Sequence, residues 1–172
     1  MKILITGKTG IAGALAEAFN NHEVHIVSRS NGYDIANWQD WAWQFDGVDI
    51  FINCAYNEWH QVGLLEHFAD SWKHDPDKTI VNIGSKVTDY SRSEREKDFE
   101  YFPYREHKKA LQSVSQSLSD TCKCRILLIN PGPVDTPMVA FLKVDKMSTD
   151  RFAKIVKMVV EVPEIRRVDA WQ

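Results

Sequence analysis

The chain has 172 residues, of which 44% are hydrophobic and 26% are charged, and its formal net charge is −3. This length and composition are typical of one soluble domain with a sizeable core, and the chain is too short for two domains of ordinary size. The weak negative charge gives no reason to expect nucleic acid or an anionic membrane as a partner, and no apolar stretch approaches the ~20 residues of a membrane span.

Apolar runs rich in β-branched residues predict strands at residues 2–6, 23–28, 48–54, 78–84 and 124–130. Apolar stripes at helical spacing predict helices within residues 11–19, 38–45, 63–73, 104–119 and 149–159. Ser148 looks like the N-terminal cap of the last helix, and residues 164–171 predict a short final strand at a sheet edge. Strands that alternate with helices are typical of a parallel sheet covered on both faces. The sequence therefore predicts an α/β fold with a doubly wound parallel sheet, as one domain over residues 1–172.

Cysteine and histidine usage indicates the surroundings of the protein. The three cysteines form no CxxC pair, which is typical of reduced thiols. The N-terminus runs directly into an apolar run, so we expect no signal peptide and a cytoplasmic location. The six histidines are scattered without ligand spacing, and we expect no metal site.

The first apolar run passes into a glycine-rich turn, with glycines at three-residue intervals before a helical pattern. Such a turn places backbone amides and the positive end of a helix dipole beside a pyrophosphate, as in a Rossmann-type, three-layer αβα fold that binds a dinucleotide. A plain glycine-rich turn is the alternative. The loop would consist of Gly7, Lys8, Thr9, Gly10, Ile11 and Gly13. A P-loop is excluded because the chain has no room for the earlier glycine of that motif.

The end of the second predicted strand indicates which dinucleotide fits. NAD calls for an acidic residue beside the ribose hydroxyls, whereas NADP calls for a basic residue beside its extra phosphate. The chain reads Ser28-Arg29-Ser30 without a carboxylate, and a guanidinium matches a phosphate in charge and geometry. The sequence thus predicts NADP rather than NAD, with an ordinary surface arginine as the alternative. Lys8 would assist the same phosphate or point into solvent.

A tyrosine and a lysine, Tyr104 and Lys108, stand four residues apart at the start of a predicted helix and share one of its faces. A nearby ammonium favours the tyrosinate and lowers the pKa of the phenol, which suits an acid/base group near neutral pH. As an isolated pair, these two residues are commonplace.

In this order along the chain, the motifs resemble the short-chain dehydrogenase/reductase family. The resemblance covers residues 1 to about 140 and rests on Thr6-Gly7 with the glycine loop, Asn53-Cys54-Ala55, Ser85, Tyr104 with Lys108, and Asn130-Pro131-Gly132 through Thr136. The set of serine, tyrosine and lysine is its most specific part.

The resemblance implies roles for the catalytic residues. Tyr104 would be the proton donor or acceptor at the substrate oxygen, and Ser85 would hydrogen-bond that oxygen. Lys108 would bind the nicotinamide ribose while tuning Tyr104. The fourth catalytic residue of the family, an asparagine, has a candidate in Asn57, for which a plain loop asparagine is the alternative. Further cofactor contacts would come from Asp34, Ile35, Asn53 and Ala55 on the adenosine side and from Pro131, Gly132, Val134 and Thr136 at the nicotinamide.

The resulting hypothesis is an NADP-dependent oxidoreductase that transfers a hydride between the nicotinamide cofactor and a small-molecule carbonyl/alcohol substrate. The alternative is a non-catalytic NADP-binding sensor or interaction protein, because most of the family's substrate-covering insertion after Met138 is missing. An epimerase or dehydratase using the same residues is a third option.

Several features depart from the family pattern. The glycine spacing belongs to its extended and atypical branches, whereas the Pro-Gly loop resembles its single-domain branch. Tyr56 follows Asn53-Cys54-Ala55 at the position where this motif of the family usually ends in glycine. The charged stretch Ser91 to Glu100 is either a lid or a plain solvated loop. The family also implies a homodimer or homotetramer through the helix of Tyr104. Trp59 and Trp72 are candidate contacts, with burial inside the monomer as the alternative.

Overall fold

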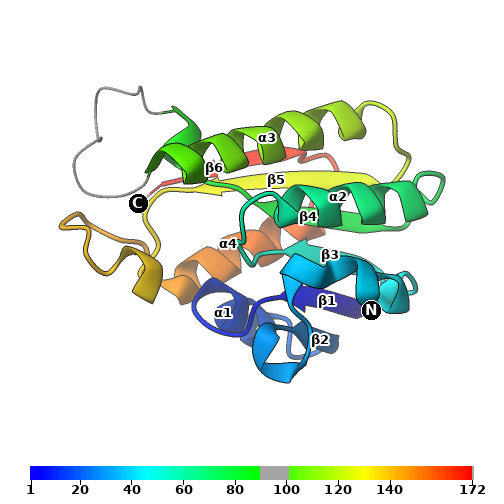
Figure 1. Cartoon of the computed structure of the whole chain (residues 1–172), viewed down its shortest axis with the longest axis horizontal. Coiled ribbons are helices and arrows are strands. Elements are labelled where there is room, and N and C mark those ends of the chain that lie inside the picture. The colour runs from blue at the N-terminus through cyan, green and yellow to red at the C-terminus, as the bar shows by residue number, and fades with distance from the viewer. Residues whose placement is uncertain (90–100, 172) are drawn as a thin grey trace.

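The computed structural model describes residues 1–89 and 101–171 and contains one sheet of six parallel strands, in the order β2-β1-β3-β4-β5-β6 (Figure 1). The strands are β1 (Lys2–Thr6), β2 (Glu23–Val27), β3 (Ile50–Asn53), β4 (Thr79–Ile83), β5 (Arg125–Pro131) and β6 (Arg167–Ala170). The α-helices are α1 (Ile11–Ala18), α2 (His60–Ser71), α3 (Tyr101–Ser119) and α4 (Thr149–Glu161). The predicted loop from Ser91 to Glu100 lies outside the described residues.

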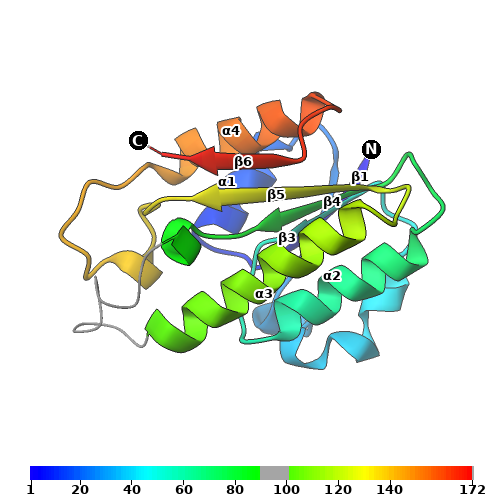
Figure 2. The same cartoon turned by 90° about the horizontal axis from the view of Figure 1, so that it is seen from above.

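Successive side chains of the strands alternate between two apolar layers. In β1, Ile3 and Ile5 pack in the layer of α1 and α4, while Leu4 packs in the layer of α2 and α3. Figure 2 shows these helix pairs on opposite faces of the sheet. Strands that are buried on both faces read as continuous apolar runs, which is why the sequence predicts them well. The doubly wound αβα arrangement is confirmed.

The predicted cap of the last helix and the predicted final strand are also confirmed. The Ser148 hydroxyl accepts a hydrogen bond from the Arg151 amide at 3.2 Å and caps α4. Strand β6 pairs with β5 at the edge of the sheet, with Asp169 beside Asn130. This pairing brings the last residues of the chain next to the carboxyl end of β5.

The segment that was predicted as a helix over residues 38–45 forms two short 3₁₀ helices instead, Ile35–Asp40 and Ala42–Phe45. The backbone leaves helical geometry at Trp41, where φ is −137° and ψ is −23°. The Trp41 ring is buried, and its indole nitrogen donates to the carbonyl of Asp34 at 2.9 Å. Because this anchored ring fixes the chain between the two turns, one continuous helix does not form.

Arg125 fixes the end of α4 before the chain enters β6. Its buried guanidinium donates to the carbonyls of Val159 (2.8 Å), Val160 (2.7 Å) and Ile165 (3.1 Å), and also to that of Val162. The last carbonyls of a helix lack helical partners, and a positive charge is favourable at this end of the dipole. The side chain therefore sets the path by which β6 returns to the sheet.

The two tryptophans predicted as candidate subunit contacts differ in their surroundings. Trp72 is 3% exposed, and its indole nitrogen donates to the Asp46 carbonyl at 2.8 Å inside the core. It is therefore a core residue of the monomer, as the alternative held. Trp59 is 54% exposed.

Within residues 1–89 and 101–171, no helix combines the length and apolarity that a membrane crossing requires. The same residues contain no cluster of three or more His, Cys, Asp or Glu side chains that could hold a metal ion.

Candidate active site

The strand order reverses between β1 and β3, since β2 lies on one side of β1 and β3 on the other. In open α/β sheets, ligands bind in the crevice at the carboxyl ends of the strands at such a switch point. Here Thr6 joins the end of β1 to the loop after β3. Its hydroxyl accepts hydrogen bonds from the amides of Cys54 and Ala55, both at 2.9 Å.

Two adjoining pockets follow this edge of the sheet. The main cavity, of about 360 Å³, extends from the glycine turn to the ends of β4 and β5. The second pocket, of about 280 Å³, lies at the end of β2. Gly7, Ala55 and Tyr56 line both, so the two form one continuous path across the sheet edge.

The glycine turn has a backbone that only glycine adopts readily. Gly7 has a φ of 97° and Gly10 a φ of 59°. A Cβ on Gly10 would also approach the Thr136 side chain to 3.2 Å, so the turn stays narrow between two loops. Gly10 caps α1 without a side-chain hydrogen bond, which leaves the first amides of this helix open to an anion.

The predicted phosphate loop and nicotinamide residues line the main cavity, with one exception. The cavity residues are Gly7, Lys8, Thr9, Gly10, Ile11, Pro131, Gly132, Val134 and Thr136. Gly13 does not line it; a Cβ there would approach the carbonyl oxygen of Lys8 to 3.2 Å. Its part is to let the helix approach the turn closely.

The adenosine-side residues gather in the second pocket, again with one exception. Ser28, Arg29, Asp34, Ile35 and Ala55 all line it. The Asp34 carboxylate accepts a hydrogen bond from the Ala36 amide at 3.0 Å and so also caps the following turn. A guanidinium and a carboxylate thus share this pocket.

Asn53 is the exception, because its side chain is fully buried under the sheet edge. Its amide nitrogen donates to the Gln61 carbonyl at 2.7 Å and to the Asn82 side chain at 3.0 Å. Asn82 donates in turn to Ser115 of α3 at 3.2 Å. This network joins β3 and β4 to α2 and α3, and the predicted cofactor contact of Asn53 does not follow from its position.

The predicted serine, tyrosine and lysine all line the main cavity. Ser85 follows β4, and its hydroxyl accepts a hydrogen bond from the Val87 amide at 3.2 Å. Tyr104 is half-buried on α3, one turn before Lys108. Asn57 lines the second pocket with Arg29 rather than this cavity, so the structure does not bring it to the other three.

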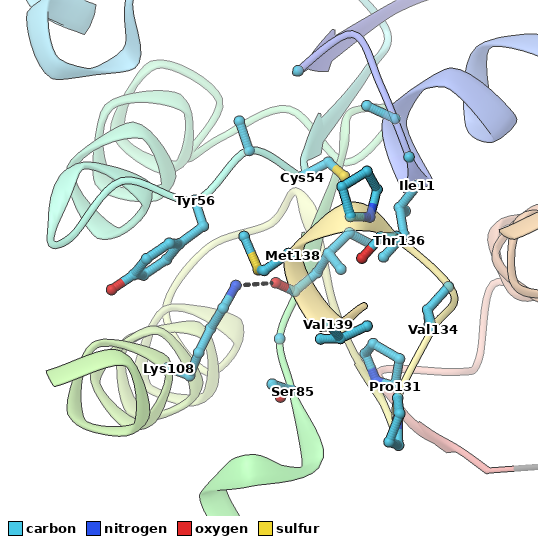
Figure 3. A pocket seen from close by; sticks show the side chains of 18 of the residues that line it. Ile11, Cys54, Tyr56, Ser85, Lys108, Pro131, Val134, Thr136, Met138 and Val139 are labelled. Atoms are coloured by element: carbon cyan, nitrogen blue, oxygen red, sulfur yellow. Dashed lines mark hydrogen bonds between the residues drawn. The ribbon is translucent and has the colours of Figure 1, made fainter. Parts of the chain in front are cut away.

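Lys108 is 3% exposed and bound at two of its three N–H groups. Its ammonium donates to the Ile83 carbonyl at 2.7 Å and to the Gln61 side-chain oxygen at 2.7 Å. Figure 3 shows Lys108 reaching from α3 toward the end of β4, where the dashed line marks its bond to Ile83. Burial lowers the pKa of Lys108 to about 7.

Two phenols lie at nearly equal distances from this ammonium. The nitrogen is 5.6 Å from the ring centroid of Tyr56 and 5.7 Å from that of Tyr104, and the two rings pack edge to face at 4.8 Å. The Tyr56 hydroxyl is hydrogen-bonded to Nδ1 of His107 at 2.8 Å. Burial, with the nearby charge of Glu58, raises the pKa of Tyr56. Tyr56 is therefore a neutral phenol near pH 7 that is bonded to His107.

The far end of the main cavity is apolar, with paired charges at its margin. Val87, Pro133, Met138, Val139 and Leu142 line it. Lys86 lines it too, but its ammonium bonds to Asp169 at 3.2 Å and to Asp89, and it lies 5.3 Å from the Trp171 ring centroid. Asp169 belongs to β6 and Trp171 follows it, so the C-terminal strand contacts the cavity through Lys86.

Sequence reasoning missed Gln61 and Lys86. Gln61 shares the buried stripe of α2 with Leu64, Leu65 and Phe68, and a polar residue at such a position is a signal that could have been used. The contact between Lys86 and Asp169 gave no comparable signal, because the two residues lie 83 positions apart.

The sequence matches no family model and no curated protein. Solved structures, however, superpose on nearly the whole chain. A short-chain dehydrogenase from Burkholderia cenocepacia in complex with NADP has a TM-score of 0.77 at 16% identity, covering 98% of this chain and 86% of that one. A 3-ketoacyl-(acyl-carrier-protein) reductase from Brucella melitensis complexed with NADH has a TM-score of 0.78 at 17% identity. This match covers 99% of this chain and 96% of that one.

A third structure with the same arrangement is a 3-alpha-hydroxysteroid dehydrogenase from Pseudomonas sp. complexed with NADH. Its TM-score is 0.73 at 16% identity, and the match covers 98% of this chain and 95% of that one. The chain therefore has the fold of the short-chain dehydrogenases and reductases.

Proposed function

We propose that the chain is a short-chain dehydrogenase/reductase that uses NADP to interconvert a carbonyl compound and an alcohol. The observation that carries the proposal is the meeting of Ser85, Tyr104 and Lys108 in one cavity that continues from the glycine turn. The residues present fit a dinucleotide, because the turn is narrow, has glycines at positions 7 and 10, and continues to a pocket with an arginine.

The three side chains have different roles in the proposed reaction. Tyr104 gives a proton to the substrate oxygen during reduction and takes it back during oxidation, while the Ser85 hydroxyl hydrogen-bonds that oxygen. Lys108 keeps one N–H for a ribose hydroxyl in the cavity, and its positive charge favours the tyrosinate. A bound nicotinamide cofactor supplies the hydride.

The choice of NADP rests on Arg29, which is exposed and lines the second pocket. Arg29→Ala is expected to raise the Kd for NADPH about tenfold, the equivalent of one charge-assisted phosphate contact, and to leave the Kd for NADH unchanged. Fluorescence titration of both cofactors measures this. Arg166→Ala is the matched control, because it removes the same charge just before β6, at the opposite edge of the sheet. Equal weakening of both cofactors would refute the role in phosphate binding.

The substrate end favours a neutral, apolar carbonyl compound. Among the described residues, the apolar lining of this end offers no free charge to a charged substrate group. The two lysines there, Lys86 and Lys108, already have partners. Burying a carboxylate without a partner is costly. Reduction of 2-octanone is therefore expected to exceed that of 7-oxooctanoate about tenfold or more in kcat/KM, followed by NADPH absorbance.

The same assay separates the competing outcomes. Asp169→Asn removes one carboxylate from Lys86 and is expected to narrow the preference for the neutral ketone. A preference for the keto acid in the unmodified protein would contradict the substrate class. Tight NADPH binding without oxidation by any carbonyl would instead favour the non-catalytic NADP-binding protein.

A further inference from the structure

The buried ammonium of Lys108 is held by an amide from a different helix. Gln61 belongs to the first turn of α2 and is 2% exposed, and its side-chain oxygen accepts a hydrogen bond from the Lys108 ammonium at 2.7 Å. The contact joins residues 47 positions apart. Two side chains thus meet without solvent between α2 and α3.

The orientation of this amide is fixed by its other contacts. The Gln61 nitrogen donates to the carbonyls of Asn53 at 2.8 Å and of Ile83 at 3.2 Å. Carbonyl oxygens only accept, so the nitrogen must face them and the amide oxygen must face Lys108. The Asn53 side chain in turn donates to the Gln61 backbone carbonyl at 2.7 Å. The last residues of β3 and β4 therefore fix the orientation of the Gln61 side chain.

We propose that Gln61 is a positioning residue for Lys108: it fixes the ammonium at the end of β4, leaves one N–H for a ligand in the main cavity, and does so without adding a charge. This inference rests on the proposed function and adds a residue that the serine, tyrosine and lysine pattern does not contain.

The absence of charge on the amide is the functional part of the arrangement. The titratable groups that face Lys108 are Cys54, which follows β3, Tyr56 from the next loop, and Tyr104 from α3. His107, the preceding residue of α3, is hydrogen-bonded to Tyr56. Burial raises the pKa of Cys54 to about 12, so its thiol is neutral. A neutral acceptor leaves Lys108 free to titrate near pH 7, whereas a carboxylate at position 61 would keep it charged.

Two variants of Gln61 with side chains of similar shape test the role of its neutral amide. Gln61→Glu adds a negative charge beside the ammonium and is expected to raise the pKa of Lys108 by about one to three units. Gln61→Met removes the acceptor and is expected to lower it. The ε-carbon shift of ¹³C-labelled lysine, assigned with Lys108→Met, reports this pKa without any turnover. The upper pH limit of ketone reduction is expected to move in the same opposite directions, because reduction requires the protonated pair.

A structural role alone would change folding but would not move the two titrations in opposite directions. Gln112→Met on α3 is the matched control and is expected to leave the titration of Lys108 unchanged. Identical titrations in all variants would overturn the proposal. If neither Gln61 variant folds, the unmodified protein decides, since a Lys108 that titrates near the ordinary lysine value of ~10.4 would overturn it as well. Failure of the proposed function shows separately, as absence of NADPH oxidation.

Discussion

Tyr104→Phe is expected to lower turnover of a carbonyl substrate about 10³-fold, the scale of a lost general acid, while changing the Kd for NADPH less than about twofold. Phenylalanine keeps the ring that packs on Tyr56 at 4.8 Å and removes only the hydroxyl. A loss in kcat with unchanged cofactor binding would place the effect on proton transfer. Stopped-flow or steady-state NADPH oxidation, together with fluorescence titration, measures both quantities.

The matched control for this variant is Tyr56→Phe, because the two phenols flank Lys108 at 5.6 and 5.7 Å. Loss of the Tyr56 hydroxyl breaks its hydrogen bond to His107 and is expected to change turnover less than about tenfold, the equivalent of one hydrogen bond. If Tyr56→Phe abolishes turnover and Tyr104→Phe does not, the proton donor is Tyr56, and the assignment from the tyrosine–lysine spacing is wrong.

Strand positions were predictable because the strands are buried on both faces. Ile3, Leu4 and Ile5 alternate between two layers, yet all are apolar, so β1 reads as one apolar run. The same alternation also bears on Asn53. In β3, Phe51 faces the layer of α2 and α3, and Asn53, two residues later, faces the same way and contacts Gln61 of α2. Its place in the buried network rather than in the cofactor path could therefore have been inferred from residue parity.

Other parts of the site depend on contacts that no local pattern encodes. Lys86 meets Asp169 only because β6 pairs beside β5 in a register that sets Asp169 opposite Asn130. The 3₁₀ turns around Trp41 arise from the anchoring of one indole, whereas the apolar spacing alone favours a helix. Local sequence thus places the loops at the sheet edge, and long-range packing decides which side chains reach the cavity.

Lys108→Met is expected to lower turnover about 10³-fold and, at the same time, to stabilise the fold below pH 7. In the unmodified protein, the pKa of Lys108 is about 7 in the folded state, against ~10.4 for an unfolded chain. Below pH 7 both states carry the proton, and the folded state bears the cost of a buried charge. Between pH 7 and about 10 the unfolded chain binds more protons, so stability rises with pH. Methionine removes this dependence.

Opposing effects on the stability of this variant differ in their response to pH. Loss of the ammonium leaves the Gln61 oxygen without its donor, which costs about 1–3 kcal/mol at every pH. The penalty for a buried charge is several kcal/mol and acts fully only at low pH, so the variant is expected to be the more stable protein at pH 6.

Melting curves of both proteins between pH 6 and 9 measure the difference, which is expected to shrink steadily as pH rises. Lys109→Met is the matched control, because this neighbouring lysine is half-exposed and pairs with Glu106 at 3.5 Å, so its removal should give no comparable slope. The range stops at pH 9 because of Cys54, whose pKa is raised by burial from 9.0 to about 12. Above pH 9 the thiol loses its proton in the unfolded chain but not in the folded one, which lowers the stability of both proteins. A constant difference between Lys108→Met and the unmodified protein would mean that Lys108 does not titrate in the folded state, and that its part in setting the proton balance of Tyr104 must be abandoned.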